Sequence, residues 1–162
     1  MAAHGVQKLF GWFGGHGLAD TRGWLDTMGF KPARLHAAVV GLAEFGGGAL
    51  LVLGLLTPLG AAAVAGVMFV AIATVHWRNG FFNTGGGFEF NLLIAATAIA
   101  LAITGPGEIS IDHLAGWTLA GVVWGLAALG TAAVAAGSVL AMRTRPPAQA
   151  QEEMSREEAP AA

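Results

Sequence analysis

The stretch that decides the fold is LHAAVVGLAEFGGGALLVLGLL, residues 35–56, which contains one acidic residue, Glu44, and no Lys or Arg. About 20 mostly apolar residues are enough for a helix to cross a bilayer, so this stretch predicts a transmembrane helix. A carboxylate near the middle of such a helix costs roughly 2.5–3.5 kcal/mol on insertion scales, which is tolerated mainly where the residue has a function. Glu44 is therefore the first candidate functional residue.

The composition of the whole chain is that of a membrane protein. Of its 162 residues, 55% are hydrophobic and only 11% are charged, whereas soluble domains have about 25% charged residues. A net charge of −2 argues against a nucleic-acid partner. The chain has no cysteine, which excludes disulfides, thiolate-ligated iron–sulfur clusters and covalently attached c-type haem within it.

Three further segments are predicted to span the membrane, which makes the chain an all-α, polytopic transmembrane helix bundle. They cover residues 59–77, about 90–104, and 114–142. A glycine-rich loop, RNGFFNTGGGFEF, joins the first two of them, and Gly105-Pro106-Gly107 ends the second. Residues 143–162 form a polar tail whose composition predicts disorder.

The basic residues predict the orientation in the membrane. Alternating the predicted spans leaves Glu108, Asp112 and His113 on one side, without any Lys or Arg. The other side carries all eight basic residues: Lys8, Arg22, Lys31, Arg34, Arg78, Arg143, Arg145 and Arg156. The positive-inside rule makes this basic side, with the tail, cytoplasmic.

Four motifs, in this order and spacing, resemble the DoxX family of small bacterial membrane proteins. They are AHGVQKLFGWFGG, AEFGGGALLVLGLLTPLGAA, VHWRNGFFNTGGGFEFN and GPGEISID. The resemblance covers about residues 2–112. It implies a compact four-helix bundle in the bacterial cytoplasmic (inner) membrane, and a link to quinone-coupled oxidoreductase systems, including sulfur-compound oxidation.

Two departures from the family pattern shape the predicted domain organisation. Family members usually carry a full apolar helix before the motif that starts at His4, so the first helix of the four-helix bundle is truncated in this sequence. We expect that the natural chain begins upstream of Met1; the alternative is a first helix that is truly truncated. The span after Asp112 is an addition to the family bundle. We therefore divide the chain into a DoxX-like bundle (1–112), an additional transmembrane helix (113–142) and the cytoplasmic tail (143–162).

Glu44 is expected to face the interior of the bundle. Gly41 and Gly48 share its helical face, and small residues allow close helix approach in membranes. The carboxyl group is then a proton relay or an acceptor for a quinol hydroxyl; the alternative is a structural hydrogen bond between helices. Lys8 is the obvious charge partner. However, Glu44 lies roughly 15 Å from the basic interface, so Lys8 extending to water is an equal alternative.

A second set of candidates forms a polar layer near the cytoplasmic side. His36, His76 and Glu89 are expected there, with Glu44, Glu89 and His76 handling protons. A quinone fits this layer chemically, and its expected binding residues are His4, Lys8, His36, Trp77, Phe81 and Phe82. The alternative is that these polar residues have no binding role and cost little free energy at this depth, because they contact water.

The same residues are also compatible with other ligands and roles, which the sequence supports less than a quinone. Haem could be ligated by His4, His36 or His76, but no spacing requires it, and zinc lacks a recognisable ligand pattern. Gly121 and Gly125 form a GxxxG that permits tight pairing, within the bundle or in a homo-oligomer. The expected function is a subunit or accessory of a quinone-linked oxidoreductase or redox-stress system, with a soluble or membrane redox partner. The alternatives are a small-molecule transporter or channel and a non-catalytic anchor for soluble enzymes.

Overall fold

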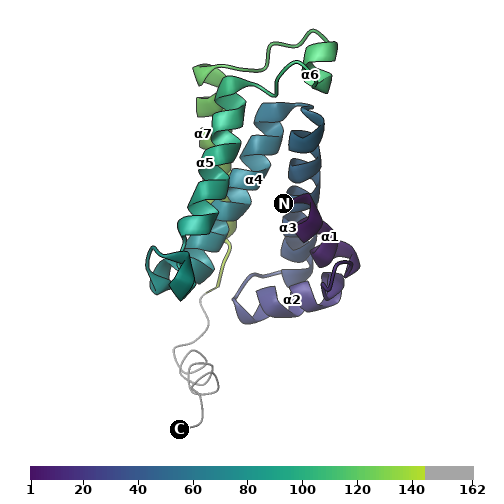
Figure 1. The fold of residues 1–162 in the computed structure, drawn as a ribbon. Coiled ribbons are helices and arrows are strands. Elements are labelled where there is room, and N and C mark those ends of the chain that lie inside the picture. The colour runs from purple at the N-terminus through teal and green to yellow at the C-terminus, as the bar shows by residue number, and fades with distance from the viewer. Residues whose placement is uncertain (145–162) are drawn as a thin grey trace.

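The computed structural model describes residues 1–144 and is helical almost throughout (Figure 1). The prediction of an all-α membrane bundle is confirmed: the described part of the chain contains helices and one isolated bridge, between Phe30 and Arg143, but no strand. The helices are α1 (Ala2–Phe10), α2 (Gly17–Thr27), α3 (Ala33–Leu53), α4 (Thr57–Ala71), α5 (Glu89–Thr104), α6 (Ile111–Leu114) and α7 (Val122–Ala141). Of the predicted tail, residues 145–162 lie outside the described residues.

The helix that starts as α4 continues beyond Ala71. A π-helical turn, Ile72–His76, and a 3-10 turn, Trp77–Asn79, extend it, so that the whole segment runs from Thr57 to Asn79. A second 3-10 turn, Asn83–Gly85, lies in the glycine-rich loop. This extended segment, α3 and α7 are each long and apolar enough to cross a membrane, while α5 is a shorter apolar helix.

The predicted final span, residues 114–142, is wrong at its start. The helix begins at Val122, and the preceding residues form the four-residue α6 and a loop. Glycine geometry explains the difference, because Gly116 and Gly121 have φ angles of +72° and +112°. These values lie outside the right-handed helical region and are accessible mainly to glycine.

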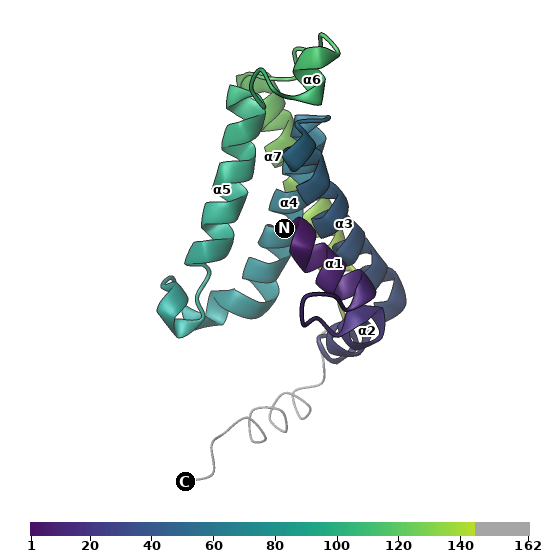
Figure 2. The ribbon, with the colours of Figure 1, turned by 45° about the vertical axis from the view of Figure 1, so that its right-hand side comes forward.

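Helix α4 lies at the centre and packs against α3, α5 and α7 (Figure 2). Its contacts are made largely by alanines, with one buried cluster formed by Ala61, Ala62, Val64, Ala98, Ala102 and Ala128. Gly125 of the GxxxG motif packs within this bundle, since an added Cβ would overlap Ile103 of α5. Gly121 has no such neighbour. Small side chains thus let the helices approach closely without a large apolar side chain between them.

The end of the bundle that carries α6 is closed by Asp112. Its Oδ1 accepts a hydrogen bond from the Leu56 backbone N–H at 2.7 Å. Its Oδ2 accepts from the Thr57 backbone N–H at 3.0 Å and from the Thr57 hydroxyl at 2.8 Å. Asp112 therefore caps the first turn of α4 from a distant part of the chain, satisfying N–H groups that a helix start leaves open. We call Thr57 and Asp112 the α6-end latch.

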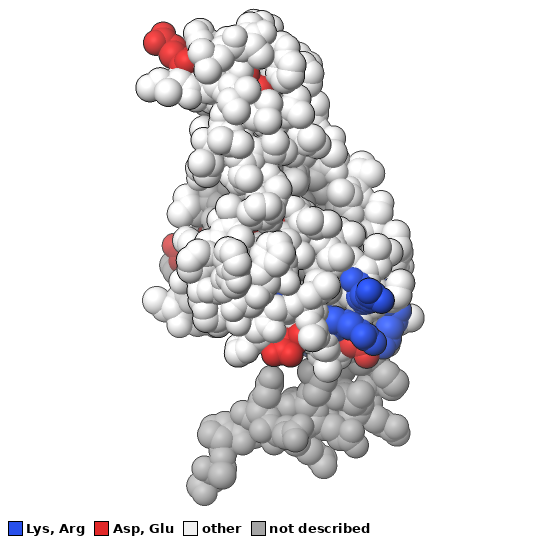
Figure 3. All heavy atoms as spheres, turned by 90° about the vertical axis from the view of Figure 1, so that its right-hand side faces the viewer, with Lys and Arg blue, Asp and Glu red and all other residues white. Residues whose placement is uncertain are grey.

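The basic side chains gather at the opposite end. Figure 3 shows Lys and Arg side chains together near the end that carries α2, while the middle of this face is uncharged. Arg22, Lys31 and Arg34 are exposed there, and Arg143 Nε donates to the Met28 carbonyl at 2.7 Å. We call this the basic end. Its cytoplasmic location stays a prediction.

Candidate functional site

Glu44 lies inside the bundle and forms an ion pair with Lys8. The glutamate is only 4% exposed. Lys8 Nζ donates to Glu44 Oε1 at 2.8 Å and to Oε2 at 2.6 Å. The alternative in which Lys8 extends to water is therefore wrong for this structure. The depth argument failed because α1 lies across the middle of α3, with its N-terminal end at mid-height in both ribbon views (Figures 1 and 2).

Glycines allow α1 to come this close to α3. A Cβ added to Gly5 would overlap the backbone of Phe45, and one added to Gly48 would overlap the backbone of Ala2. A Cβ on Gly41 would overlap the side chain of Leu9. The small residues predicted on the Glu44 face thus form the seat of α1. This close approach brings the Lys8 ammonium group within hydrogen-bonding distance of the Glu44 carboxylate.

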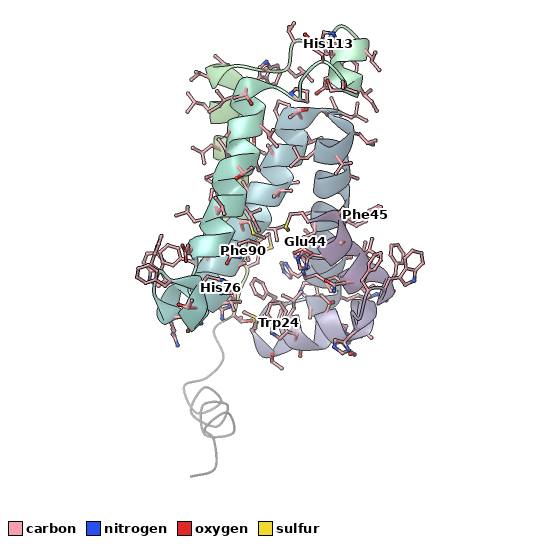
Figure 4. The ribbon with its side chains drawn as sticks, viewed as in Figure 1. Trp24, Glu44, Phe45, His76, Phe90 and His113 are labelled. Carbon is pink, nitrogen blue, oxygen red and sulfur yellow. The ribbon has the colours of Figure 1, made fainter. Side chains whose placement is uncertain are left out.

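A pocket of about 480 Å³ lies beside this ion pair, between α1 to α5 and α7. The volume is within the range of small-molecule sites, roughly 300–1,000 Å³. Its polar lining residues are His4, Lys8, His36, Glu44, Thr74, His76, Asn83 and Asn91. Its aromatic lining residues are Trp24, Phe30 and Phe90. In Figure 4, Trp24 and His76 lie nearer the basic end than Glu44 does.

His36 is the group in this pocket whose hydrogen bonding is incomplete. The residue is 7% exposed, and its Nε2 has no hydrogen-bond partner within the described chain. Its ring lies 5.4 Å from the ring of Phe30, centroid to centroid. A buried polar atom left unpaired costs about 1–3 kcal/mol. Nε2 therefore has an unused hydrogen-bonding capacity, in a residue that lines the pocket.

The π-helical turn positions His76. Thr74, Val75 and His76 all line the pocket. His76 Nδ1 is 2.7 Å from the Gly86 carbonyl oxygen, so it donates to that oxygen and leaves Nε2 as an acceptor. Asn79 Nδ2 donates to the same oxygen at 3.2 Å. Single π turns in α-helices occur often at functional sites.

Four predicted residues lie outside the pocket. Glu89 Oε2 instead accepts a hydrogen bond from the Asn83 backbone N–H at 3.0 Å, which fixes the start of α5 to the loop. Trp77 stacks on Phe88 with ring centroids 5.3 Å apart. Phe81 packs edge-on against Phe82 and Phe88. The predicted layer of His36, His76 and Glu89 is thus brought together only in its two histidines, and the aromatic residues stabilise the loop beside it.

The sequence prediction missed Trp24, Phe30, Phe90 and Asn91 as lining residues. Phe30 is 1% exposed although it stands in a connection between helices. Asn91 had a usable signal, because it is a polar residue in a predicted span, two positions after Glu89. Within residues 1–144, no three His, Asp or Glu side chains are close enough to hold one metal ion.

Comparisons with known proteins address the family. The family model described as DoxX matches residues 1–77. The inner membrane protein YqjF of Escherichia coli (strain K12) is 35% identical over 106 residues, which cover 64% of this chain and 78% of YqjF. The chain belongs to the DoxX family. No solved structure matches it.

The family match indicates what class of protein this DoxX protein is and in which membrane it lies. It is an integral membrane protein, and its apolar helices and its relationship to YqjF support location in the bacterial inner membrane. The part matched by the family model contains Lys8, His36, Glu44 and His76. The ion pair and the three histidines that line the pocket therefore belong to the family region of the chain, and α5 and α7 complete the pocket from outside it.

Proposed function

We propose that this DoxX protein is a membrane subunit or accessory of a quinone-linked oxidoreductase or redox-stress system, and that its pocket binds the quinone headgroup. The observation that carries the proposal is the unpaired Nε2 of His36, buried in the same pocket as the Lys8–Glu44 ion pair. A hydrogen-bonding group and a proton-exchanging group thus face one largely apolar space.

A quinone headgroup matches this lining in both shape and chemistry. Its carbonyl oxygens accept hydrogen bonds, which His36 and the remaining N–H of Lys8 can donate. Its planar ring fits between aromatic side chains, and Trp24, Phe30 and Phe90 supply these. Reduction to a quinol takes up two electrons and two protons. In this proposal Glu44 and the histidines exchange the protons, while a redox partner protein supplies or removes the electrons.

The loop residues take a supporting part in the proposed site. Glu89 and the aromatic group of Trp77, Phe81 and Phe82 shape the loop that carries Asn83 to the pocket. His4, which is exposed at the pocket edge, tunes the charge near Lys8. None of these four loop residues is required to contact the ring.

The test is quinone binding by purified protein in lipid nanodiscs. Titration with short-chain ubiquinone and menaquinone analogues is followed by quenching of tryptophan fluorescence and by thermal stabilisation. Ligand at 100 times its Kd stabilises the folded state by about 2.7 kcal/mol. His36→Leu replaces the imidazole by an apolar side chain of similar size and so removes Nε2. It should weaken binding about tenfold, since one hydrogen bond is worth about 1.5 kcal/mol.

His113→Leu is the matched control, because His113 is exposed at the opposite end of the molecule. It should bind quinone as the unmodified protein does. Trp24→Phe should remove much of the quenching while leaving the thermal stabilisation, since Trp24 lines the pocket. Absence of quinone-dependent stabilisation, or equal affinity of His36→Leu, would contradict the proposal.

A further inference from the structure

The polar residues of the pocket are confined to one half of the bundle. The buried polar side chains of the described residues are His36, Glu44, Thr57, Ser110 and Asp112. The first two line the pocket, and the other three belong to the end that carries α6. We propose that the part of the pocket between the basic end and Glu44 is an aqueous half-channel: water and protons reach Glu44 from the basic end only.

Beyond Glu44 the described part of the bundle offers no buried polar side chain before Thr57, Ser110 and Asp112 at the end that carries α6. Residues 45–53 of α3 and 58–73 of the α4 segment are all apolar. In α5, Thr97 is exposed and its hydroxyl donates to the Leu93 carbonyl of its own helix. Nine residues of α3 correspond to about 14 Å along the helix axis. Space lined only by apolar groups stays dry, so this layer separates Glu44 from the far end.

The far end is also closed by complete hydrogen bonding. Thr57 and Asp112 are each 1% exposed. The hydrogen bonds of their side chains are with each other or with the backbone at the start of α4. Neither side chain lines the pocket. The α6-end latch therefore offers no second entrance toward Glu44.

The basic end provides the entrance. Trp24 is 49% exposed and Asn83 is also exposed, and both line the pocket. His36 stands between this mouth and Glu44, about 12 Å from Glu44 along α3. At roughly 30 Å³ per water molecule, the pocket has room for water along that distance. His36, whose Nε2 has no hydrogen-bond partner within the described residues, lies part-way along it.

This inference rests on the proposed role of Glu44 in proton exchange, and it adds the side from which exchange occurs. Its test needs no quinone, so its failure is separate from failure of quinone binding. The chain has no cysteine, so single cysteines can be introduced directly. A charged, membrane-impermeant methanethiosulfonate reagent reacts with a thiolate, and therefore with thiols that contact water.

Two cysteines report on the pocket and two report on the membrane sides. Ala43→Cys lies beside Glu44 and Thr74→Cys lies nearer the mouth, both in the pocket lining. Arg78→Cys marks the basic end, and Glu108→Cys marks the end that carries α6; both positions are exposed. Each variant is treated in right-side-out and in inverted membrane vesicles, and labelling is counted by mass spectrometry of the intact protein.

The expected result is that Ala43→Cys and Thr74→Cys are modified from the side that modifies Arg78→Cys, and are protected from the side that modifies Glu108→Cys. His36→Phe in the Ala43→Cys background should slow its labelling at least fivefold and leave Arg78→Cys labelling unchanged. Labelling of Ala43→Cys from the Glu108 side would overturn the half-channel, and so would its failure to react from either side while Thr74→Cys reacts. Retained helix content by circular dichroism verifies that each variant is folded.

Discussion

Lys8 Nζ lies 2.6 Å from Glu44 Oε2, although the two residues are 36 positions apart and come from helices of very different length. The pair is asymmetric in its environment, because the Lys8 side chain is 27% exposed and the Glu44 side chain only 5%. A carboxylate this deep needs its cation, whereas the cation keeps some access to water. The pair thus ties the short α1 to the transmembrane α3 and places a charge beside the pocket.

Removing the cation alone should destabilise the protein more than removing both charges. Lys8→Met leaves Glu44 buried without a partner, and breaking a buried pair in this way costs about 3 kcal/mol or more. The double variant Lys8→Met/Glu44→Leu replaces the pair by apolar groups and should recover most of that loss. The measurement is the unfolding midpoint in nanodiscs or mixed micelles. Equal stability of the single and double variants would show that Glu44 does not depend on Lys8.

The seat of α1 should tolerate no side chain at Gly48. A single methyl group there overlaps the backbone of Ala2, and backbone cannot rotate away as a side chain does. Gly48→Ala is expected to lower stability by about 1–3 kcal/mol through overpacking. Gly46→Ala is the matched control, two residues away on the same helix, because an added Cβ there meets nothing within 4 Å. A similar loss in both variants would mean that the α1 contact does not set the effect, since Gly→Ala in a helix by itself favours the helix.

The α6-end latch should be a stabilising element without a part in ligand binding. Asp112→Ala removes the acceptor of three hydrogen bonds at the start of α4, and loss of a cap with buried partners costs about 2 kcal/mol. Glu108→Ala, at an exposed position of the same connection, should leave stability unchanged. Thermal unfolding compares the two, and quinone titration of Asp112→Ala should give the affinity of the unmodified protein.

The sequence predicted those parts of the fold that depend on the length of apolar segments and on residues that end helices. Residues 35–56 predicted α3 to within three residues at each end. The helix ends earlier than predicted because Gly54 adopts a left-handed conformation, with a φ angle of +56°. The start of the last span was mispredicted because residues 114–121 are apolar enough to span but contain two glycines in non-helical conformations. Composition reports whether a segment suits the membrane, and it does not report positive φ angles.

The candidate site was predictable residue by residue only where charge made burial costly. Glu44 stood out because a carboxylate in an apolar span must be compensated, and its partner Lys8 was named for the same reason. Glu89 begins α5, as predicted, but it does not line the pocket, because its carboxylate bonds the backbone of the loop that folds back before it. Phe30 gave no signal, since burial of an apolar residue in a connection depends on how α7 returns to it through Arg143.

The π-helical turn of the α4 segment should be required for the pocket geometry. It holds one residue more per turn than the α-helix around it, and no proline or glycine in Ile72–His76 marks it in the sequence. Deleting Ala73, which is exposed and does not line the pocket, should convert the turn to a regular α-helix. In a regular α-helix successive side chains step by about 100°, more than in the wider π turn, so Thr74, Val75 and His76 can no longer all face the pocket as they do now. His76 should then lose its position beside the pocket and its bond to the Gly86 carbonyl.

Quinone affinity should consequently fall at least tenfold on deletion of Ala73, while helix content by circular dichroism stays the same. Thr74→Ala is the matched control: it removes the hydroxyl that donates to the Val70 carbonyl at 2.8 Å, but keeps the number of residues in the turn. Its affinity should remain within about twofold of the unmodified protein, because a single exchangeable hydrogen bond is worth about 1 kcal/mol or less when water can replace it. If both variants bind alike, the π turn is dispensable and the bundle positions His76 by other contacts.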